Sequence, residues 1–291
     1  MNEPLQPPSE PTPSLIEATI VALGDDSAPV RDAARRRLLA WGDAAVPFLH
    51  RGAEVDSVRT RARCRAVLRS LEIRSLLRRF GRLRLARVER ASAPGLLDGA
   101  VLLAQMVRTF VPDASRLASR LRREASALRD DCSGRTLPTC ARLLAQRLHG
   151  RLALRGAGGA EPDLEHVLID RVLAKGVGVP VSLSLIYLLV ARWAGLSAAG
   201  VALPDHFLVR LHGTRPVLLD PFHGGRTVTK ADCARYLRMS GHERVRDHLR
   251  DLSDREVLIH YLRCLRGAAG RRPGSDASES LGQALSLLET R

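Results

Sequence analysis

The stretch from residue 178 to residue 225 constrains the fold of this chain more than any other part of the sequence. It begins with Gly-Val-Pro and an apolar run that is too long for an ordinary strand, which predicts a buried helix ending at a turn around Gly195. Short apolar and β-branched runs follow, separated by glycine and proline, and they predict strands over residues 199–203, 206–211 and 217–220. A helix followed by such strands predicts an α+β fold with a small antiparallel sheet.

Two side chains at the ends of neighbouring strands are suited to nucleophilic catalysis. His206 opens its strand and Asp220 closes the next, so a turn around residues 212–216 would bring the two together in an antiparallel pair. A carboxylate beside an imidazole fixes the tautomer of the ring and stabilises its charged form. In a nucleophilic triad, the imidazole is the base and the carboxylate is the residue that orients it. The nucleophile, a cysteine, would lie at the helix start, where the helix dipole lowers the pKa of a thiol. Pro180 occupies that place.

Several segments of the sequence resemble one protein family. These are GVPVSLSLIYLLVARWAGL, LPDHFLVR, LLDPFHGG and REVLIHYLRCLRG, all within residues 95–266. In this order they resemble the SirB-type family of bacterial transglutaminase-like proteins, which implies a papain-like core. The resemblance assigns the family's histidine to His206 and its aspartate to Asp220. Counted back from Arg192, the catalytic cysteine of active transglutaminase-like enzymes falls on Pro180.

No other residue of the sequence clearly replaces the missing nucleophile. The cysteines lie away from the helix start, at Cys64, Cys132, Cys140, Cys233 and Cys264. Ser182 and Ser184 are closer, but on a helix their side chains are rotated by about 200° and 40° from residue 180. Proline itself offers no nucleophile, which favours a protein without thiol catalysis.

The cysteine and histidine patterns indicate no metal and no other cofactor. The cysteine count is odd and the sequence has no C-x-x-C, so neither a disulfide framework nor a zinc site is predicted, and a reducing compartment fits best. Histidines that lie near Asp205 and Asp220 in sequence raise a metal site as an alternative: His212, His223, His242 and His248. They include no helical i, i+4 pair and no cysteine cluster, so we expect no metal here.

The chain carries a formal net charge of +15, which makes nucleic acid a partner to consider. All of its 46 basic residues except Lys175 and Lys230 are arginine, and they are spread over almost every predicted helix. Aromatic residues make up only 3% of the sequence, which leaves few rings to stack on bases. We therefore interpret the arginines as solvated helix faces and keep nucleic-acid binding as an alternative to a protein partner.

Residues 14–75 contain a short internal repeat. The segment SAPVRDAARRRLL returns as VDSVRTRARCRAVL with a spacing of 28, and in each copy the apolar positions follow helical spacing. This part of the chain resembles HEAT-like helical repeats, which implies either a protein-binding surface or a support stacked on the next domain.

The remaining segments complete the predicted organisation. Residues 1–13 are rich in proline and should form a disordered arm, followed by a helix with Ser14 as its N-cap. The arginine-rich residues 76–94 should form an amphipathic connecting helix, with a membrane surface or an acidic partner as the alternative role. Residues 95–266 carry the family resemblance, and residues 267–291 form a linker and a C-terminal helix.

No targeting or membrane-spanning segment is expected. The N-terminal residues lack the basic and apolar regions of a signal peptide. The longest mostly apolar run, residues 181–194, is shorter than the roughly 20 residues needed to span a bilayer. We expect a soluble cytoplasmic protein without membrane insertion.

Two functions follow as hypotheses. The first is a catalytically inactive transglutaminase-like protein that acts as a protein-binding or regulatory module, since the nucleophile position holds Pro180. The alternative is an acyl-transfer or amide-hydrolysing enzyme that uses His206 and Asp220 with a non-standard nucleophile, such as an activated water or Cys233. Loss of the nucleophile removes most of the rate enhancement of a triad, which favours the first hypothesis.

Overall fold

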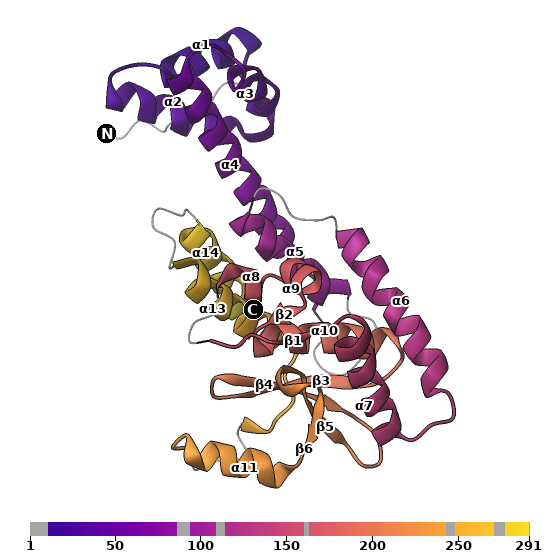
Figure 1. The fold of residues 1–291 in the computed structure, drawn as a ribbon. Helices are drawn as coiled ribbons and strands as arrows, with labels where there is room; N and C mark the ends of the chain where they lie inside the picture. Colours follow the sequence, from indigo (N-terminus) through magenta and orange to yellow (C-terminus); the bar gives the residue numbers. More distant parts are fainter. Residues whose placement is uncertain are drawn as a thin grey trace. The chain divides into compact units, whose positions relative to one another are not determined.

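A computed structural model describes residues 11–85, 94–108, 114–159, 163–242, 248–270 and 277–290. The chain divides into two compact units, Met1–Arg78 and Arg79–Arg291. The predicted α+β class is confirmed, because helices dominate and the main sheet is small and antiparallel (Figure 1). In the described part of the chain, no helix is both long and apolar enough to cross a membrane.

The first unit consists of helices around an apolar core of its own. Its helices are α1 Pro13–Leu23, α2 Ala28–Trp41, α3 Val46–Gly52 and most of α4 Val58–Phe80. The two copies of the sequence repeat lie on α2 and α4. Their periodic apolar positions include Leu38 and Val67, which are buried in one cluster with Ile16, Leu23 and Leu49. The helical spacing of the repeat is therefore confirmed.

The first helix starts earlier than predicted. Thr12 caps α1, and its Oγ1 accepts a hydrogen bond from the backbone N of Leu15 at 3.4 Å. Proline is favoured at the first helical position because its missing N–H would have no partner there. The helix therefore begins at Pro13, so Ser14, the predicted N-cap, lies inside the helix. Of the predicted disordered arm, residues 1–10 lie outside the described residues.

Of the predicted connecting helix over residues 76–94, the described part is helical only as far as Phe80. α4 runs without a break from Val58 to Phe80, so the start of this segment continues a helix of the repeat region. Gly81 follows, and glycine is less favourable than alanine inside a helix by about 1 kcal/mol. Residues 81–85 are not helical, and residues 86–93 lie outside the described residues.

Helices also precede and follow the sheet of the second unit. Before it lie α5 Pro94–Val107, α6 Ala114–Cys132, α7 Leu137–Ala145 with a π-helical continuation Gln146–Arg151, α8 Leu164–Val167 and α9 Ile169–Lys175. After it lie α11 Lys230–Met239, α13 Asp254–Gly270 and α14 Ala277–Glu289. Because α13 continues to Gly270, the linker predicted from residue 267 is wrong over its first residues. Residues 271–276 lie outside the described residues.

The main sheet contains the three predicted strands and one more. Its order is β3-β4-β5-β6, every neighbouring pair is antiparallel, and the strands are β3 Ala198–Leu203, β4 His206–Leu211, β5 Val217–Asp220 and β6 Arg226–Val228. Leu203 pairs with His206 across a tight turn, and Val209 pairs with Leu219. β6 was not predicted, because it is short, largely exposed and not apolar. A separate parallel pair joins β1 Arg155–Gly156 and β2 Val177–Gly178.

The predicted buried helix is α10, Pro180–Trp193, and it is the core of the second unit (Figure 1). Every residue from Val181 to Arg192 is buried, because the helix packs against β3 and β4 and also against α6 and α13. Near the end of the helix, Arg192 Nε donates a hydrogen bond to the carbonyl of Ala198 at 2.9 Å, and Arg192 Nη1 lies 2.5 Å from Asp254 Oδ1. One side chain thus joins α10, β3 and α13.

Candidate functional site

His206 and Asp220 lie side by side on the sheet. The Nε2 atom of His206 is 3.0 Å from Oδ1 of Asp220. Continuing the β4–β5 register places Asp220 opposite Leu208. His206 is two residues before Leu208, so it lies on the same face of the sheet and diagonal to Asp220, within reach of a long side chain. The structure therefore brings together the two residues that the sequence places at strand ends.

A second histidine, His223, contacts the same carboxylate. Its Nδ1 is 2.7 Å from Oδ2 of Asp220, and its backbone N donates a hydrogen bond to Oδ1 at 3.2 Å. The 3₁₀ turn Pro221–His223, for which Asp220 is the N-cap, makes both contacts possible. From the sequence, His223 is expected only as one of several alternative metal ligands. An aspartate followed by proline and, three residues on, by histidine is the capping signal that could have placed it.

The Asp220 carboxylate is buried and yet ionised. Only 3% of its side chain is exposed. Burial alone would raise its pKa, but the hydrogen bonds and charges of His206 and His223 outweigh burial and lower the pKa to about 2. Arg226 adds a cation, with its Nε 3.5 Å from Oδ2 of Asp220. The carboxylate can therefore orient two imidazole rings at neutral pH.

These three side chains also offer metal-ligating atoms. One ligand atom each from His206, Asp220 and His223 lies within 4.8 Å of the others, and the described residues contain no further group of this kind. The ligands come from a strand start, a strand end and a turn. Because none of the three lies on an α-helix, their spacing in the sequence does not follow the helical i, i+4 pattern.

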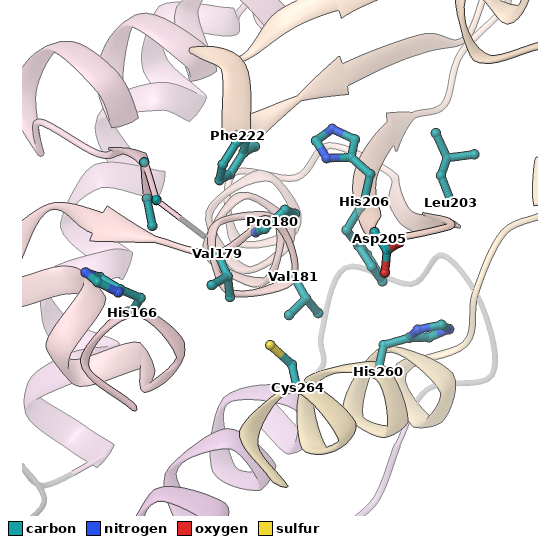
Figure 2. Close-up of a pocket in the computed structure, with 14 residues that line it drawn as sticks. His166, Val179, Pro180, Val181, Leu203, Asp205, His206, Phe222, His260 and Cys264 are labelled. Carbon is teal, nitrogen blue, oxygen red and sulfur yellow. The ribbon is translucent and has the colours of Figure 1, made fainter. Parts of the chain in front are cut away.

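A cleft of about 610 Å³ opens beside His206 (Figure 2). Pro180, the first residue of α10, lines this cleft together with His206, so the helix start and the imidazole face the same space. The ring of Phe222 also lines it and packs edge-on against His206, with ring centroids 5.9 Å apart. His260 and Cys264 line it from α13.

The two serines after Pro180 do not offer their hydroxyls to the cleft. Both residues are fully buried. Ser182 Oγ donates a hydrogen bond to the carbonyl of Val167 at 2.7 Å, and Ser184 Oγ donates to the carbonyl of Phe207 at 3.2 Å. Their hydroxyls tie α10 to its neighbours, so neither takes the place of a nucleophile.

A cysteine that was not predicted to be near the site, Cys264, lines this cleft. Cys264 follows His260 by four residues on α13, which puts both side chains on one helix face toward the cleft (Figure 2). The i, i+4 spacing in HYLRC was the available signal. Cys233, the cysteine considered from the sequence, does not line this cleft and packs in an apolar cluster with Leu203 and Leu237. It lines a smaller cavity on another side of His206. Burial raises the pKa of the Cys233 thiol, which disfavours the reactive thiolate.

Comparison with known proteins shows that the lining residues of the cleft, except Cys264, fall within one recognised domain. A family model described as "Transglutaminase-like superfamily" matches residues 109–263, which is more than half of the chain. UPF0162 proteins of Xylella fastidiosa strains 9a5c and Temecula1 are 41% and 40% identical to this chain over 88 residues, which cover 30% of this chain and 28% of each relative. A UPF0162 protein of Vibrio cholerae is 38% identical over 64 residues, or 21% of this chain and 24% of that relative.

The chain therefore spans only about a quarter of the length of the curated relatives that it matches. No solved structure matches the chain significantly.

Proposed function

Since this chain belongs to the transglutaminase-like superfamily, we propose that it is a member without thiol catalysis that serves as a protein-binding or regulatory module. One observation carries the proposal: Pro180 stands at the first position of α10, on the same cleft as His206. A thiol-dependent acyl transfer needs a thiolate at the helix start, where the helix dipole and the imidazole stabilise it. A prolyl ring supplies no nucleophile, and loss of the nucleophile removes most of the rate enhancement of a triad.

The histidine and the aspartate have a structural role that does not require catalysis. Asp220 accepts one hydrogen bond from the backbone N of His223 and contacts His206 Nε2, so its carboxylate holds the end of β5 to the start of β4. A protein that has lost the thiol can therefore keep this pair to maintain the shape of the cleft.

The cleft has the size and lining of a binding site. Its volume of about 610 Å³ falls within the range of about 300–1,000 Å³ that is usual for ligand pockets. Apolar Val181, Leu203 and Phe222 and the imidazoles of His206 and His260 line it. Such a lining suits an apolar side chain next to a polar backbone group, as in an extended segment of a protein partner.

Within the superfamily, the segments quoted from the sequence favour the SirB-type branch over residues 95–266. The repeat on α2 and α4 favours a HEAT-like role for the first unit, which would add a second surface for a protein partner. The arginine-rich composition keeps nucleic acid as an alternative partner, which strong salt dependence of binding would reveal.

The catalytic part of the proposal is tested with three full-length proteins. Hydrolysis and transamidation of a glutamine-containing peptide are measured for the wild type, for Pro180→Cys and for Pro180→Cys combined with His206→Asn. The wild type should show no turnover that iodoacetamide abolishes, whereas Pro180→Cys should gain such turnover and the double variant should lose it. Wild-type turnover that iodoacetamide abolishes would overturn the proposal.

The binding part is tested by site-specific photo-crosslinking. A photo-reactive amino acid at Leu203, in the cleft, should capture a partner that the same group at Met239, exposed on α11, does not capture. Filling the cleft with Val181→Trp should remove the cross-link at residue 203. Equal capture from both positions would contradict binding in the cleft.

A second candidate function is an acyl-transfer or amide-hydrolysing enzyme that uses His206 and Asp220 with another nucleophile. The observation that favours it is Cys264, which lines the same cleft as His206. In that case Cys264→Ser should abolish turnover, whereas Cys64→Ser, in the apolar core of the first unit, should leave it unchanged.

A further inference from the structure

We propose that His206, Asp220 and His223 form a binding site for a divalent transition metal ion of the zinc class. Their ligand atoms, one from each side chain, lie within 4.8 Å of one another. Two imidazoles and one carboxylate are a ligand set that Zn²⁺ and neighbouring metals accept, with a water molecule completing the coordination. This inference is independent of the proposed function, because a bound metal requires neither a thiol nor a protein partner.

The distances in the cluster are close to those that a metal needs. Nε2 of His206 and Nδ1 of His223 lie 3.0 and 2.7 Å from the two oxygens of one carboxylate. Ligands bound to zinc at about 2.0–2.1 Å in tetrahedral geometry stand about 3.3 Å apart. Each of these nitrogen–oxygen contacts has to open by only a few tenths of an ångström for an ion to replace the proton between the two atoms. The longest separation in the cluster, which is within 4.8 Å, has to shorten toward about 3.3 Å, and rotation of the exposed His223 side chain can supply this change.

The site combines two fixed ligands with one accessible ligand. Asp220 and His206 have only 3% and 13% of their side chains exposed, and both belong to strands of the sheet. The His223 side chain is 51% exposed, so an ion can reach the cluster from solvent. A small cavity of about 110 Å³ adjoins all three side chains, which is room for water ligands at about 30 Å³ each.

A cation already lies at the carboxylate, and it gives the proposal a specific prediction. Arg226 Nε is 3.5 Å from Asp220 Oδ2, and 62% of the arginine side chain is exposed. The guanidinium competes with a metal for the same oxygen, and its exposure allows it to move aside. Replacing Arg226 with methionine should therefore tighten metal binding, an effect that a folding defect would not produce.

The His206 ring cannot serve at the same time as a metal ligand and as a catalytic base. As a base it would donate Nε2–H to Asp220 and accept a proton at Nδ1, whereas a neutral ring that binds a metal through Nε2 carries its proton on Nδ1. Metal binding and the second candidate function therefore exclude each other at this ring. The Pro180→Cys experiment does not depend on the metal, because it can be performed in the presence of a chelator.

The experiment uses the full-length chain, freed of metal with a chelator and then titrated with Zn²⁺ by calorimetry and with Co²⁺ by visible absorption. The wild type should bind one ion per chain, and His223→Asn and Asp220→Asn should each weaken binding at least tenfold. Arg226→Met should bind more tightly than the wild type. The control is His212→Asn, because His212 follows the same strand and its Nε2 lies 3.2 Å from a different carboxylate, Asp251.

Three results would overturn the proposal. These are the absence of a Co²⁺ spectrum in the wild type, equal affinities of the wild type and His223→Asn, and a loss in His212→Asn as large as that in His223→Asn. The His223 side chain is half-exposed, so His223→Asn should retain the fold. Circular dichroism of each variant checks this. If Asp220→Asn fails to fold, the increase in metal affinity expected for Arg226→Met still tests the proposal.

Discussion

Arg192 and Asp254 form an ion pair in the interior of the second unit. Their side chains are 2% and 0% exposed, and Arg192 Nη1 lies 2.5 Å from Asp254 Oδ1. Arg192 Nε also donates a hydrogen bond to the carbonyl of Ala198, at the start of β3. Arg192, near the C-terminal end of α10, therefore joins this helix to the sheet and to α13.

Removing one partner of this pair should destabilise the protein strongly. We expect Arg192→Leu to lower the free energy of unfolding by about 3–5 kcal/mol, because Asp254 would remain buried without its countercharge. The double variant Arg192→Leu with Asp254→Leu should be less destabilised than the single one. Denaturant unfolding followed by circular dichroism measures both.

The matched control is Arg235→Leu, which removes an exposed arginine paired with Asp232 in the same unit. Its loss should stay below about 1 kcal/mol. If Arg192→Leu were no more harmful than Arg235→Leu, the interior pair would have no role in stability.

Glu256 should contribute stability that depends on pH. Its Oε2 accepts hydrogen bonds from the backbone N and the Oγ of Ser253, both at 2.8 Å, and its Oε1 lies 2.5 Å from Arg250 Nη2. Burial would raise its pKa, but these partners lower it to about 2. The unfolded value is about 4.3, so the contribution is complete above about pH 5 and is lost as the pH falls through about 2.

Glu256→Gln should therefore cost about 1 kcal/mol at pH 6, after allowance for solvent screening, and progressively less toward pH 2. Denaturant unfolding at several pH values measures this, with Glu279→Gln on the exposed face of α14 as the control substitution. A penalty that grows as the pH falls would contradict the assignment.

A thiol placed at residue 180 should be unusually acidic. The first turn of α10 and the imidazole of His206 both stabilise a thiolate there, so the pKa in Pro180→Cys should fall below the ordinary value of about 8.5. The pH dependence of iodoacetamide alkylation, followed by mass spectrometry of the peptide that contains residue 180, measures it. Adding His206→Asn should move the midpoint back up, and an unchanged midpoint would show that the ring does not act on this position.

Two neighbouring glycines should differ in their tolerance of a methyl group. Gly224 and Gly225 both have positive φ, +76° and +70°. A Cβ at Gly224 would meet nothing within 4 Å, whereas a Cβ at Gly225 would lie 2.2 Å from Tyr187 Oη and 2.6 Å from the Cβ of Ala145. Gly224→Ala should cost about 1–2 kcal/mol from backbone strain, and Gly225→Ala about 1–3 kcal/mol more from overpacking.

Tyr187→Phe removes the clashing oxygen, which has no hydrogen-bond partner among the described residues. It should therefore recover part of the loss in Gly225→Ala when the two changes are combined. Thermal and denaturant unfolding of the four variants check the series. Equal losses for the two glycine variants would mean that the turn moves away from Tyr187.

Long apolar elements were predictable from the sequence, whereas contacts made through short ones were not. The run after Pro180 predicts α10, and the short apolar and β-branched runs that begin at His206 and end at Asp220 predict β4 and β5 with their contact. The contact of His223 with Asp220 depends on a three-residue turn, which is too short to show a repeating pattern of apolar residues in the sequence. The i, i+4 spacing puts Cys264 on the same helix face as His260, but this face lines the cleft only because α13 packs against α10, which the spacing does not encode.

The burial of Arg192 also affects when α10 can fold into place during synthesis of the chain. Asp254 lies 62 residues later, so a ribosome completes α10 well before the countercharge exists. At about 5–20 residues per second this interval lasts about 3–12 s. Burying the arginine without Asp254 would leave an uncompensated charge in the interior, so we expect α10 to stay out of its final place until then, with its apolar surface available to chaperones. A chain truncated before α13 would thus be a substrate for protein quality control, even with every strand of the sheet already made.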